Sequence, residues 1–260
     1  MNLRLPRKRF GQNFLHDPNI IQKIITSMNP QKEDHFVEIG PGQGAITEPL
    51  SKAAGKLDVI EIDQDLADDL LTRPWANKLN MHRGDALRFP FNTISTKPAA
   101  LRLAGNLPYN ISTPLLFHIL NYYQLFRDIH IMLQKEVVQR MTAQPGSKTY
   151  GRLTVALAAR CRVESLFVIG PGAFRPAPKV ESAFARLIPL PQPLITESEA
   201  PVFDDILRRT FGQRRKQLQN TLRNMLTAEQ IQSTGIAPTV RAEMLSVEQF
   251  VALTQAVIKT

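Results

Sequence analysis

Short apolar runs alternate with stretches of helical spacing over the first 110 residues of this 260-residue chain and continue beyond them, and this alternation constrains the fold most. Strands that alternate with helices form βαβ units, so the pattern predicts a parallel sheet covered by helices. The runs are bounded by turn residues, as buried strands are. They are HFVEIG (35–40), LDVIEID (57–63), AALRLAGN (99–106) and DIHIMLQ (128–134), followed by LFVIG (166–170) and FARLIPL (184–190).

The pattern changes near residue 190. Residues 189–201 read PLPQPLITESEAP, and repeated prolines can continue neither a helix nor a central strand. Beyond this linker, Ser246 and Gln249 have the spacing of a capping box at the start of a helix. The sequence therefore predicts an α/β domain over residues 1–190, with a basic N-terminal arm over 1–15, and a small helical domain over 191–260.

Composition excludes several classes of protein. Hydrophobic residues make up 43% of the chain and charged residues 21%, which is enough apolar matter to bury a core. No apolar run approaches the roughly 20 residues of a membrane-spanning helix. The single cysteine, Cys161, rules out an internal disulfide framework and favours a cytoplasmic protein, and the histidines show no metal-ligand spacing. A net charge of +9 favours a polyanionic partner, nucleic acid first.

Three glycines alternate where the first predicted strand ends, as HFVEI runs into GPGQGAIT. Gly40, Gly42 and Gly44 permit positive φ and place no Cβ between the backbone and a ligand. The spacing is G-x-G-x-G, which differs from the dinucleotide-binding G-x-G-x-x-G. By itself the loop leaves a ligand-binding turn and an ordinary connecting turn equally open.

Acidic residues follow at the ends of the next two predicted strands. Glu61 lies about twenty positions past the glycines, where a carboxylate can accept hydrogen bonds from ribose hydroxyls. Asp63 and Asp65 are nearby and could serve equally. Asp85, in a turn after a short third strand, can accept a hydrogen bond from an adenine amine. Ligands of open parallel sheets bind at this edge, so the series is stronger than any one member.

The tetrapeptide from Asn106 to Tyr109 carries the chemistry. It resembles the [Asn/Asp/Ser]-Pro-Pro-[Tyr/Phe] signature of amino-methyltransferases that use S-adenosylmethionine. The exocyclic amine of adenine is a poor nucleophile, and two acceptors on its N–H groups favour the pyramidal nitrogen that develops during attack. The Asn106 side chain and the carbonyl of Leu107 or Pro108 can accept, and the Tyr109 ring can stack on a base. The alternative is a proline turn with a packed tyrosine.

Further blocks along almost the whole chain resemble the KsgA-type small-subunit ribosomal RNA adenine N6,N6-dimethyltransferases. This resemblance implies a Rossmann-like class I methyltransferase domain and S-adenosylmethionine as methyl donor. It also implies two adjacent adenosines near the 3′ end of 16S rRNA as acceptors, within the small (30S) subunit. The blocks are KRFGQNFL (8–15), EIGPGQGAIT (38–47), GNLPYNISTP (105–114), LQKEVVQRM (133–141), YGRL (150–153), GAFRPAPKVESA (172–183) and FGQRRKQLQNTL (211–222).

The resemblance also implies roles for single residues. On the target side, Phe174 would complete a stacking sandwich with Tyr109 around a flipped adenine, whereas the local sequence alone favours a packed aromatic. On the cofactor side, the N-terminal arm would close over the ligand, the glycines would line its methionine end, and the acids would hold its ribose and adenine. The implied cofactor residues are Gln12, Asn13, Leu15, Gly40, Gly42, Glu61, Ile62, Asp85, Ala86 and Asn106.

Two basic clusters are candidates for RNA contact. The first includes Arg7 and Lys8, and the second lies in a stretch without an acid from Ile206 to Ala228. Phosphate contacts of this kind weaken steeply with salt, and a target base must be unpaired or flipped out to reach the cofactor. The candidates in the second cluster are Arg208, Arg214, Arg215, Lys216 and Arg223.

Three alternatives remain at this point. A large-subunit rRNA adenine methyltransferase of the macrolide-resistance type shares the core motifs. A ribosome-assembly factor, or a transcription factor descended from this fold, would act mainly by binding. A nicotinamide oxidoreductase is the weakest, because the glycine spacing differs. The sequence favours a monomeric small-subunit enzyme.

Overall fold

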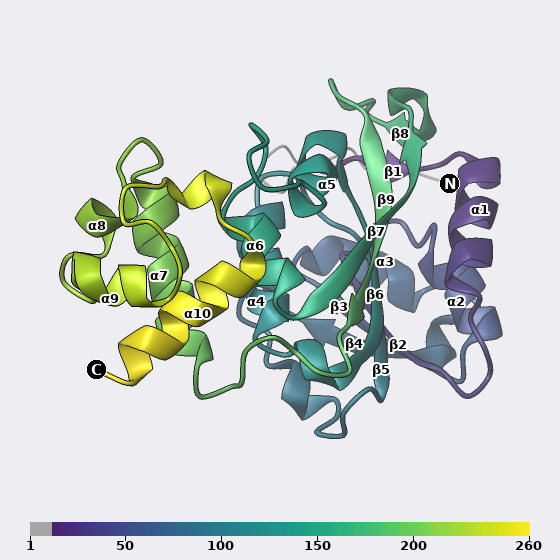
Figure 1. The fold of residues 1–260 in the computed structure, drawn as a ribbon. Coiled ribbons are helices and arrows are strands. Elements are labelled where there is room, and N and C mark those ends of the chain that lie inside the picture. Colours follow the sequence, from purple (N-terminus) through teal and green to yellow (C-terminus); the bar gives the residue numbers. More distant parts are fainter. Residues whose placement is uncertain (1–11) are drawn as a thin grey trace. The chain divides into compact units, whose positions relative to one another are not determined.

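The computed structural model describes residues 12–260 and divides the chain into two compact units (Figure 1). The first extends to Val138 and takes in Glu164–Pro189, and the second consists of Gln139–Val163 and Leu190–Thr260. The crossing at residue 190 coincides with the predicted linker. The second unit also includes residues 139–163, which the sequence-based prediction assigned to the first domain, residues 1–190. The difference arises because the chain leaves the sheet at the end of one strand, at Gln134, and returns to it only at the start of the next, at Cys161.

A seven-stranded sheet forms the centre of the first unit, in the order β4-β3-β2-β5-β6-β9-β7. The first five strands of this order pair in parallel, and β9 pairs antiparallel with β6. The predicted parallel sheet is therefore confirmed. Its strands are β2 (His35–Ile39), β3 (Lys56–Glu61), β4 (Leu79–Arg83), β5 (Leu101–Asn106), β6 (Phe126–Gln134), β7 (Cys161–Ile169) and β9 (Ser182–Pro189).

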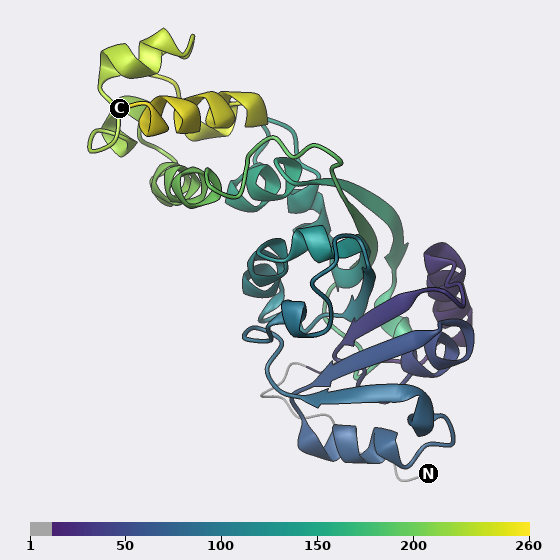
Figure 2. The same cartoon turned by 90° about the horizontal axis from the view of Figure 1, so that it is seen from below.

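Helices cover both faces of this sheet, with α1 and α2 on one face and α4 on the other (Figure 2). The core on the first face contains Ile24 of α1 and Leu50 of α2, packed in one cluster with Phe36 and Val59 from the strands. Burial of such apolar side chains is the main stabilising term in folding. The helices of the first unit are α1 (Pro18–Met28), α2 (Thr47–Ala53), α3 (Gln64–Leu71) and α4 (Ser112–Leu120), and α5 (Lys135–Met141) continues into the second unit.

A separate two-stranded sheet joins the N-terminal arm to a distant loop. β1 (Phe14–Leu15) pairs antiparallel with β8 (Phe174–Arg175), and Leu15 lies opposite Phe174. The His16 N–H extends the pairing by donating to the Ala173 carbonyl at 2.9 Å. This strap places residues 12–15 beside the carboxyl ends of the parallel strands.

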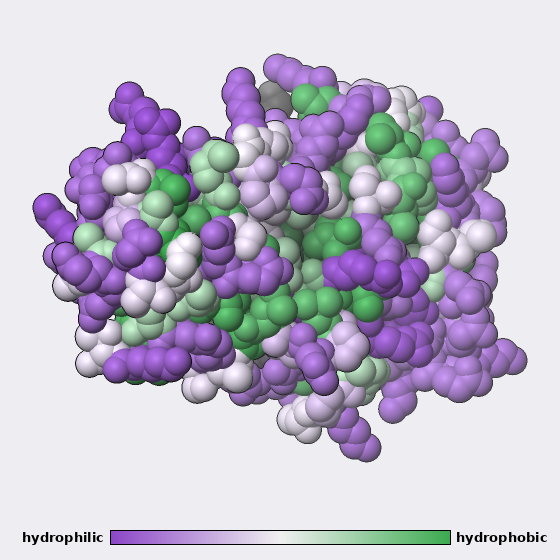
Figure 3. All heavy atoms as spheres, in the orientation of Figure 1, coloured by the Kyte–Doolittle hydropathy of each residue, from purple (hydrophilic) through white to green (hydrophobic). Residues whose placement is uncertain are grey.

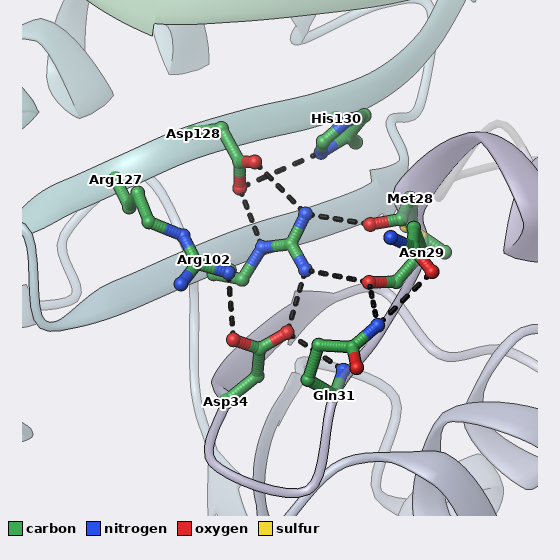
Figure 4. Close-up of polar contacts among 8 residues, drawn as sticks. All are labelled: Met28, Asn29, Gln31, Asp34, Arg102, Arg127, Asp128 and His130. Atoms are coloured by element: carbon green, nitrogen blue, oxygen red, sulfur yellow. Dashed lines mark hydrogen bonds and ion pairs between the residues drawn. The ribbon is translucent and has the colours of Figure 1, made fainter.

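A buried ion cluster closes the amino-terminal end of the sheet (Figure 4). The Arg102 guanidinium at the start of β5 lies 2.6 Å from Asp34 and 2.8 Å from Asp128. It also donates to the Met28 carbonyl at the end of α1, at 2.6 Å. The cluster therefore ties α1 and the β5 and β6 strands together at the edge opposite the glycine loop.

The second unit is helical, as predicted for the chain beyond the linker. Its capping box is present at Ser246, whose hydroxyl accepts from the Gln249 N–H while the Gln249 side chain accepts from the Ser246 N–H. Tyr150 is buried and donates to the Leu245 carbonyl at 2.7 Å, which holds the 139–163 segment in this unit. The remaining helices are α6 (Arg152–Ala158), α7 (Ala200–Gly212), α8 (Leu218–Thr221), α9 (Ala228–Ser233) and α10 (Val247–Ile258).

On the face drawn in Figure 3, hydrophilic side chains cover much of the molecule. Across residues 12–260, every helix is too short or too polar to cross a bilayer.

Candidate active site

A cavity of about 330 Å³ opens at the carboxyl ends of the parallel strands. It lies where strand order reverses, because β3 and β4 extend to one side of β2 while β5 and β6 extend to the other. Parallel sheets bind ligands at such a switch point. Every residue predicted to contact the cofactor lines this cavity, and Leu107, Pro108 and Tyr109 line it as well.

The glycine loop shapes the floor of the cavity. Gly40 and Gly42 have φ of +66° and +57°, which L side chains rarely adopt. A Cβ on Gly42 would lie 3.2 Å from the Phe14 ring, so the N-terminal arm packs directly on this loop. Sequence reasoning did not single out Phe14, and only the folded chain places it here.

Of the three acids near the end of β3, Glu61, Asp63 and Asp65, Glu61 is the one that lines the cavity. Its carboxylate accepts hydrogen bonds from the Asp63 N–H at 2.9 Å and the Gly42 N–H at 3.3 Å. Burial raises the pKa of Glu61, and these hydrogen bonds oppose that rise. Asp63 instead caps α3 by accepting from the Asp65 N–H, and it also accepts from Gln12 at 3.2 Å. The structure thus assigns the cavity to Glu61 and a helix cap to Asp63, two roles that the sequence could not distinguish.

Glu38 is a further carboxylate in the cavity, at the end of β2. It is 2% exposed, and among residues 12–260 its Oε2 atom has no hydrogen-bond partner. Burial, with the nearby Glu61 charge, raises the pKa of Glu38 to about 8. Such an orphaned acceptor suits a ligand that carries donors or positive charge.

The cavity walls fit S-adenosylmethionine, which carries an ammonium group, a sulfonium, a ribose and an adenine. Glu38 and Glu61 offer acceptors to the charged and hydroxyl groups. Ile62 is 47% exposed at the opening, a large apolar surface that an adenine ring can cover. Asp85 uses Oδ1 to accept from the Leu87 N–H at 2.9 Å, which fixes its carboxylate beside Ala86. The residues present therefore match the group.

The turn from Asn106 to Tyr109 presents its acceptors selectively. The Asn106 side-chain nitrogen donates to the Asn13 carbonyl at 2.9 Å, so its oxygen is the atom left to accept. The Pro108 carbonyl already accepts from the Ile111 N–H at 3.2 Å and the Ser112 hydroxyl at 3.0 Å. Both of its lone pairs are therefore in use. Within the described part of the chain the Leu107 carbonyl accepts no hydrogen bond, so the structure favours Leu107 over Pro108 as the second acceptor.

Phe174 is not brought to the cavity. It is 2% exposed and packs in the core cluster with Leu15, Ile24 and Ala173. Its backbone is held opposite Leu15 in the strap. A stacking role with Tyr109 would require the ring to leave this core position.

The basic candidates divide by their partners. Arg7 and Lys8 lie outside the described residues. Arg208 forms an ion pair with Asp205, and Arg214 donates to the Tyr150 carbonyl at 3.0 Å and approaches Glu243 at 3.4 Å. Sequence reasoning missed Asp205 because it immediately precedes the acid-free stretch. Within residues 12–260, three exposed cations of the cluster have no ion pair: Arg215, Lys216 and Arg223.

Comparison with known proteins gives a consistent set of matches. A family model described as ribosomal RNA adenine dimethylase matches residues 4–259. The ribosomal RNA small subunit methyltransferase A of Pseudomonas syringae pv. syringae is 51% identical over 252 residues, covering 95% of this chain and 92% of that protein. The protein of the same name from Nitrosospira multiformis is 49% identical over 249 residues, covering 96% and 95%.

Solved structures match over similar lengths. A dimethyladenosine transferase from Plasmodium falciparum superposes with a TM-score of 0.77 at 27% identity, covering 92% of this chain and 95% of that one. The 23S rRNA methyltransferase ErmE superposes with a TM-score of 0.69 at 22% identity, covering 95% and 100%. At that identity the match to ErmE shows a shared fold and nothing about the substrate.

Proposed function

The chain belongs to the ribosomal RNA adenine dimethylase family, and we propose that it dimethylates the N6 amines of two adjacent adenosines near the 3′ end of 16S rRNA. The methyl donor in this proposal is S-adenosylmethionine, and the reaction is a late step in assembly of the small ribosomal subunit. Relatives at about 50% identity that are named for the small subunit support this substrate over the large subunit.

The geometry of the turn from Asn106 to Tyr109 carries the proposal. The Asn106 side-chain oxygen and the Leu107 carbonyl are the acceptors left for the two N–H groups of a target amine. Accepting from both directs the nitrogen lone pair out of the ring plane, which favours attack. Neither group is a base, so catalysis rests on orientation, and the proton leaves to water afterwards.

The cofactor would supply an electrophilic methyl group when bound. In this chain Glu61 would accept from the ribose hydroxyls, and Asp85 would accept from the adenine amine. Glu38 would face the cationic end of the ligand, beside Gly40 and Gly42. Gln12, Asn13 and Leu15 would close the cavity from the N-terminal arm.

The RNA would be held by the helical unit. Arg215, Lys216 and Arg223 are the cations of the second cluster without an ion pair among the described residues, so we assign phosphate contact to them first. Arg208 and Arg214 are then secondary contacts, because each already has a protein partner. We further propose that the enzyme acts as a cytoplasmic monomer on the 30S subunit and that the target adenosine is flipped out of its stack.

A transfer assay tests the proposed reaction. Labelled S-adenosylmethionine is incubated with undermethylated small subunits, with large subunits as control, and the RNA is digested to nucleosides. N6,N6-dimethyladenosine from small subunits alone is the expected result. Label on large subunits alone would favour a resistance-type enzyme. Tight binding to immature small subunits without label would favour an assembly factor.

A pair of variants tests the division of roles. Glu61→Ala should weaken cofactor binding and leave RNA binding intact. The triple variant Arg215→Ala, Lys216→Ala, Arg223→Ala should weaken RNA binding and reduce its log–log salt slope by about 2. The matched control Arg208→Ala, Arg209→Ala removes two cations that already pair with Asp205, and its slope should change less. Equal slope changes would contradict the assignment.

A further inference from the structure

We propose that Ser182 is a positioning residue for the target base, because its hydroxyl anchors the far end of the Tyr109 ring that lines the cavity. This inference rests on the proposed function and extends it to a residue 73 positions away from Tyr109 in the sequence. Ser182 touches neither the cavity nor, in this scheme, the reacting atoms. It acts through Tyr109.

The contact is short and partly buried. Tyr109 Oη lies 2.6 Å from Ser182 Oγ. Ser182 is fully buried, so its hydroxyl has no access to solvent as an alternative partner. Burial raises the pKa of Tyr109, so the phenol stays protonated at neutral pH and the hydrogen bond persists.

The anchor belongs to the rigid part of the sheet. Ser182 is the first residue of β9 and lies opposite Gln134, the last residue of β6. The ladder continues one step further, where the Lys135 N–H donates to the Glu181 carbonyl at 2.9 Å and the two side chains form an ion pair at 2.8 Å. Because β9 is antiparallel, its first residue reaches the same edge at which the parallel strands end.

Tyr109, by contrast, lies in an irregular turn between β5 and α4. The backbone end of this turn is held by Ser112, whose hydroxyl lies 3.0 Å from the Pro108 carbonyl and 3.2 Å from the Tyr109 carbonyl. Ser182 holds the hydroxyl end of Tyr109, so the residue is held at both its backbone and its hydroxyl end. Removal of the far anchor frees rotation about χ1, and displacements of about 1 Å can cost large factors in rate.

A double-mutant cycle tests the proposal. Ser182→Ala and Tyr109→Phe each remove the hydrogen bond while the aromatic ring stays in place. We expect each to lower kcat for subunit methylation about three- to tenfold, with KM for S-adenosylmethionine unchanged. The double variant should be no slower than either single variant, because both remove the same contact.

Tyr150→Phe is the matched control. It removes another buried tyrosine hydrogen bond, to the Leu245 carbonyl in the helical unit, so it should lower thermal stability without lowering kcat. Additive losses in the cycle would overturn the proposal. So would full activity of Ser182→Ala and Tyr109→Phe together with a lowered melting temperature, which would leave the contact a structural one.

A second readout does not depend on methyl transfer. An RNA hairpin with 2-aminopurine at the target position loses fluorescence when the base stacks on an aromatic ring. We expect the wild type to quench the probe, Ser182→Ala to quench it less, and Tyr109→Ala to abolish the effect. Quenching of the probe by the wild type, together with no label on small subunits in the transfer assay, would refute the proposed function while still testing the anchor. Equal quenching by the wild type and Ser182→Ala would refute the anchor alone.

Discussion

Two buried carboxylates at opposite ends of β2 titrate in opposite directions. Asp34 precedes the strand and Glu38 lies near its end, and their exposures are 5% and 2%. Burial alone would raise the pKa of both. At Asp34, hydrogen bonds from the Gln31 N–H, Arg102 and Arg127 outweigh burial and hold the pKa below its usual value. At Glu38 the compensation is insufficient, and the pKa rises to about 8.

The opposite pKa shifts of Asp34 and Glu38 reflect different environments at the two ends of the sheet. At the amino end the charges are paired within the protein, which favours a stable structure. At the carboxyl end acceptors such as Glu38 Oε2 lack partners among residues 12–260, which favours a ligand that brings its own donors. Similar burial therefore supports stability at one end and binding at the other.

The largest expected effect is at Arg102. Arg102→Met leaves the Asp34 and Asp128 carboxylates without their buried counter-ion, which should cost about 3–5 kcal/mol in the free energy of unfolding. Urea denaturation at pH 7 measures this. Arg127→Met is the matched control, since Arg127 also pairs with Asp34 but is 53% exposed, and it should cost less than about 1 kcal/mol. Equal costs would show that burial does not govern the amino end.

Glu38→Gln tests the carboxyl end. The folded-state pKa of about 8 lies above the ordinary value of 4.5, so the folded protein binds more protons than the unfolded chain between them. Stability should therefore fall as pH rises, by about 3 kcal/mol between pH 4.5 and pH 7. Glutamine does not titrate, so the variant should lack this decline in denaturation series at pH 5, 6, 7 and 8. Parallel curves for the two proteins would refute the assignment.

His130 gives a smaller effect of the opposite sign near the amino end. It is 1% exposed, both ring nitrogens lack hydrogen-bond partners in the described chain, and Nδ1 lies 3.7 Å from the Asp128 carboxylate. Burial, with the charges of Arg102 and Arg186 nearby, lowers the pKa of His130 to about 4, although the Asp128 charge opposes this shift. The unfolded chain protonates first, so stability present above pH 6.5 is lost as pH falls, by about 2 kcal/mol down to pH 5. His130→Leu should remove this loss in acid denaturation, and an unchanged acid slope would contradict it.

Gly42→Ala should give the smallest change in stability. A left-handed backbone costs an L residue roughly 1–2 kcal/mol, and the new Cβ would press on Phe14. Gly170→Ala is the control, because φ there is −71° and a Cβ would meet nothing within 4 Å. Thermal denaturation compares the two. A control that loses as much stability as Gly42→Ala would show that the left-handed backbone of the glycine loop is not the cause of the loss.

Much of the fold and the cavity follows from local pattern. Glu61 and Asn106 end their strands and Asp85 follows the end of a third, and parallel strands bring their ends to one edge, so their convergence could be predicted before any contact was known. Phe174 differs: the resemblance assigned it to the target site, and the structure places it in the core cluster. The sequence also could not choose between Leu107 and Pro108, because that choice depends on hydrogen bonds that Ile111 and Ser112 make only in the folded turn.

The sequence by itself determined the alternation of strands and helices, the helical C-terminal part, the family and the predicted cofactor residues that line the cavity. These are set by local periodicity and by motifs, which need no knowledge of distant contacts. The tertiary structure alone decided that Asp205 forms an ion pair with Arg208 and that Ser182 forms a hydrogen bond with Tyr109. It also decided that Oε2 of Glu38 has no hydrogen-bond partner among residues 12–260. Such pairings join residues whose distance in space is unrelated to their spacing in sequence, so only the packed chain specifies them.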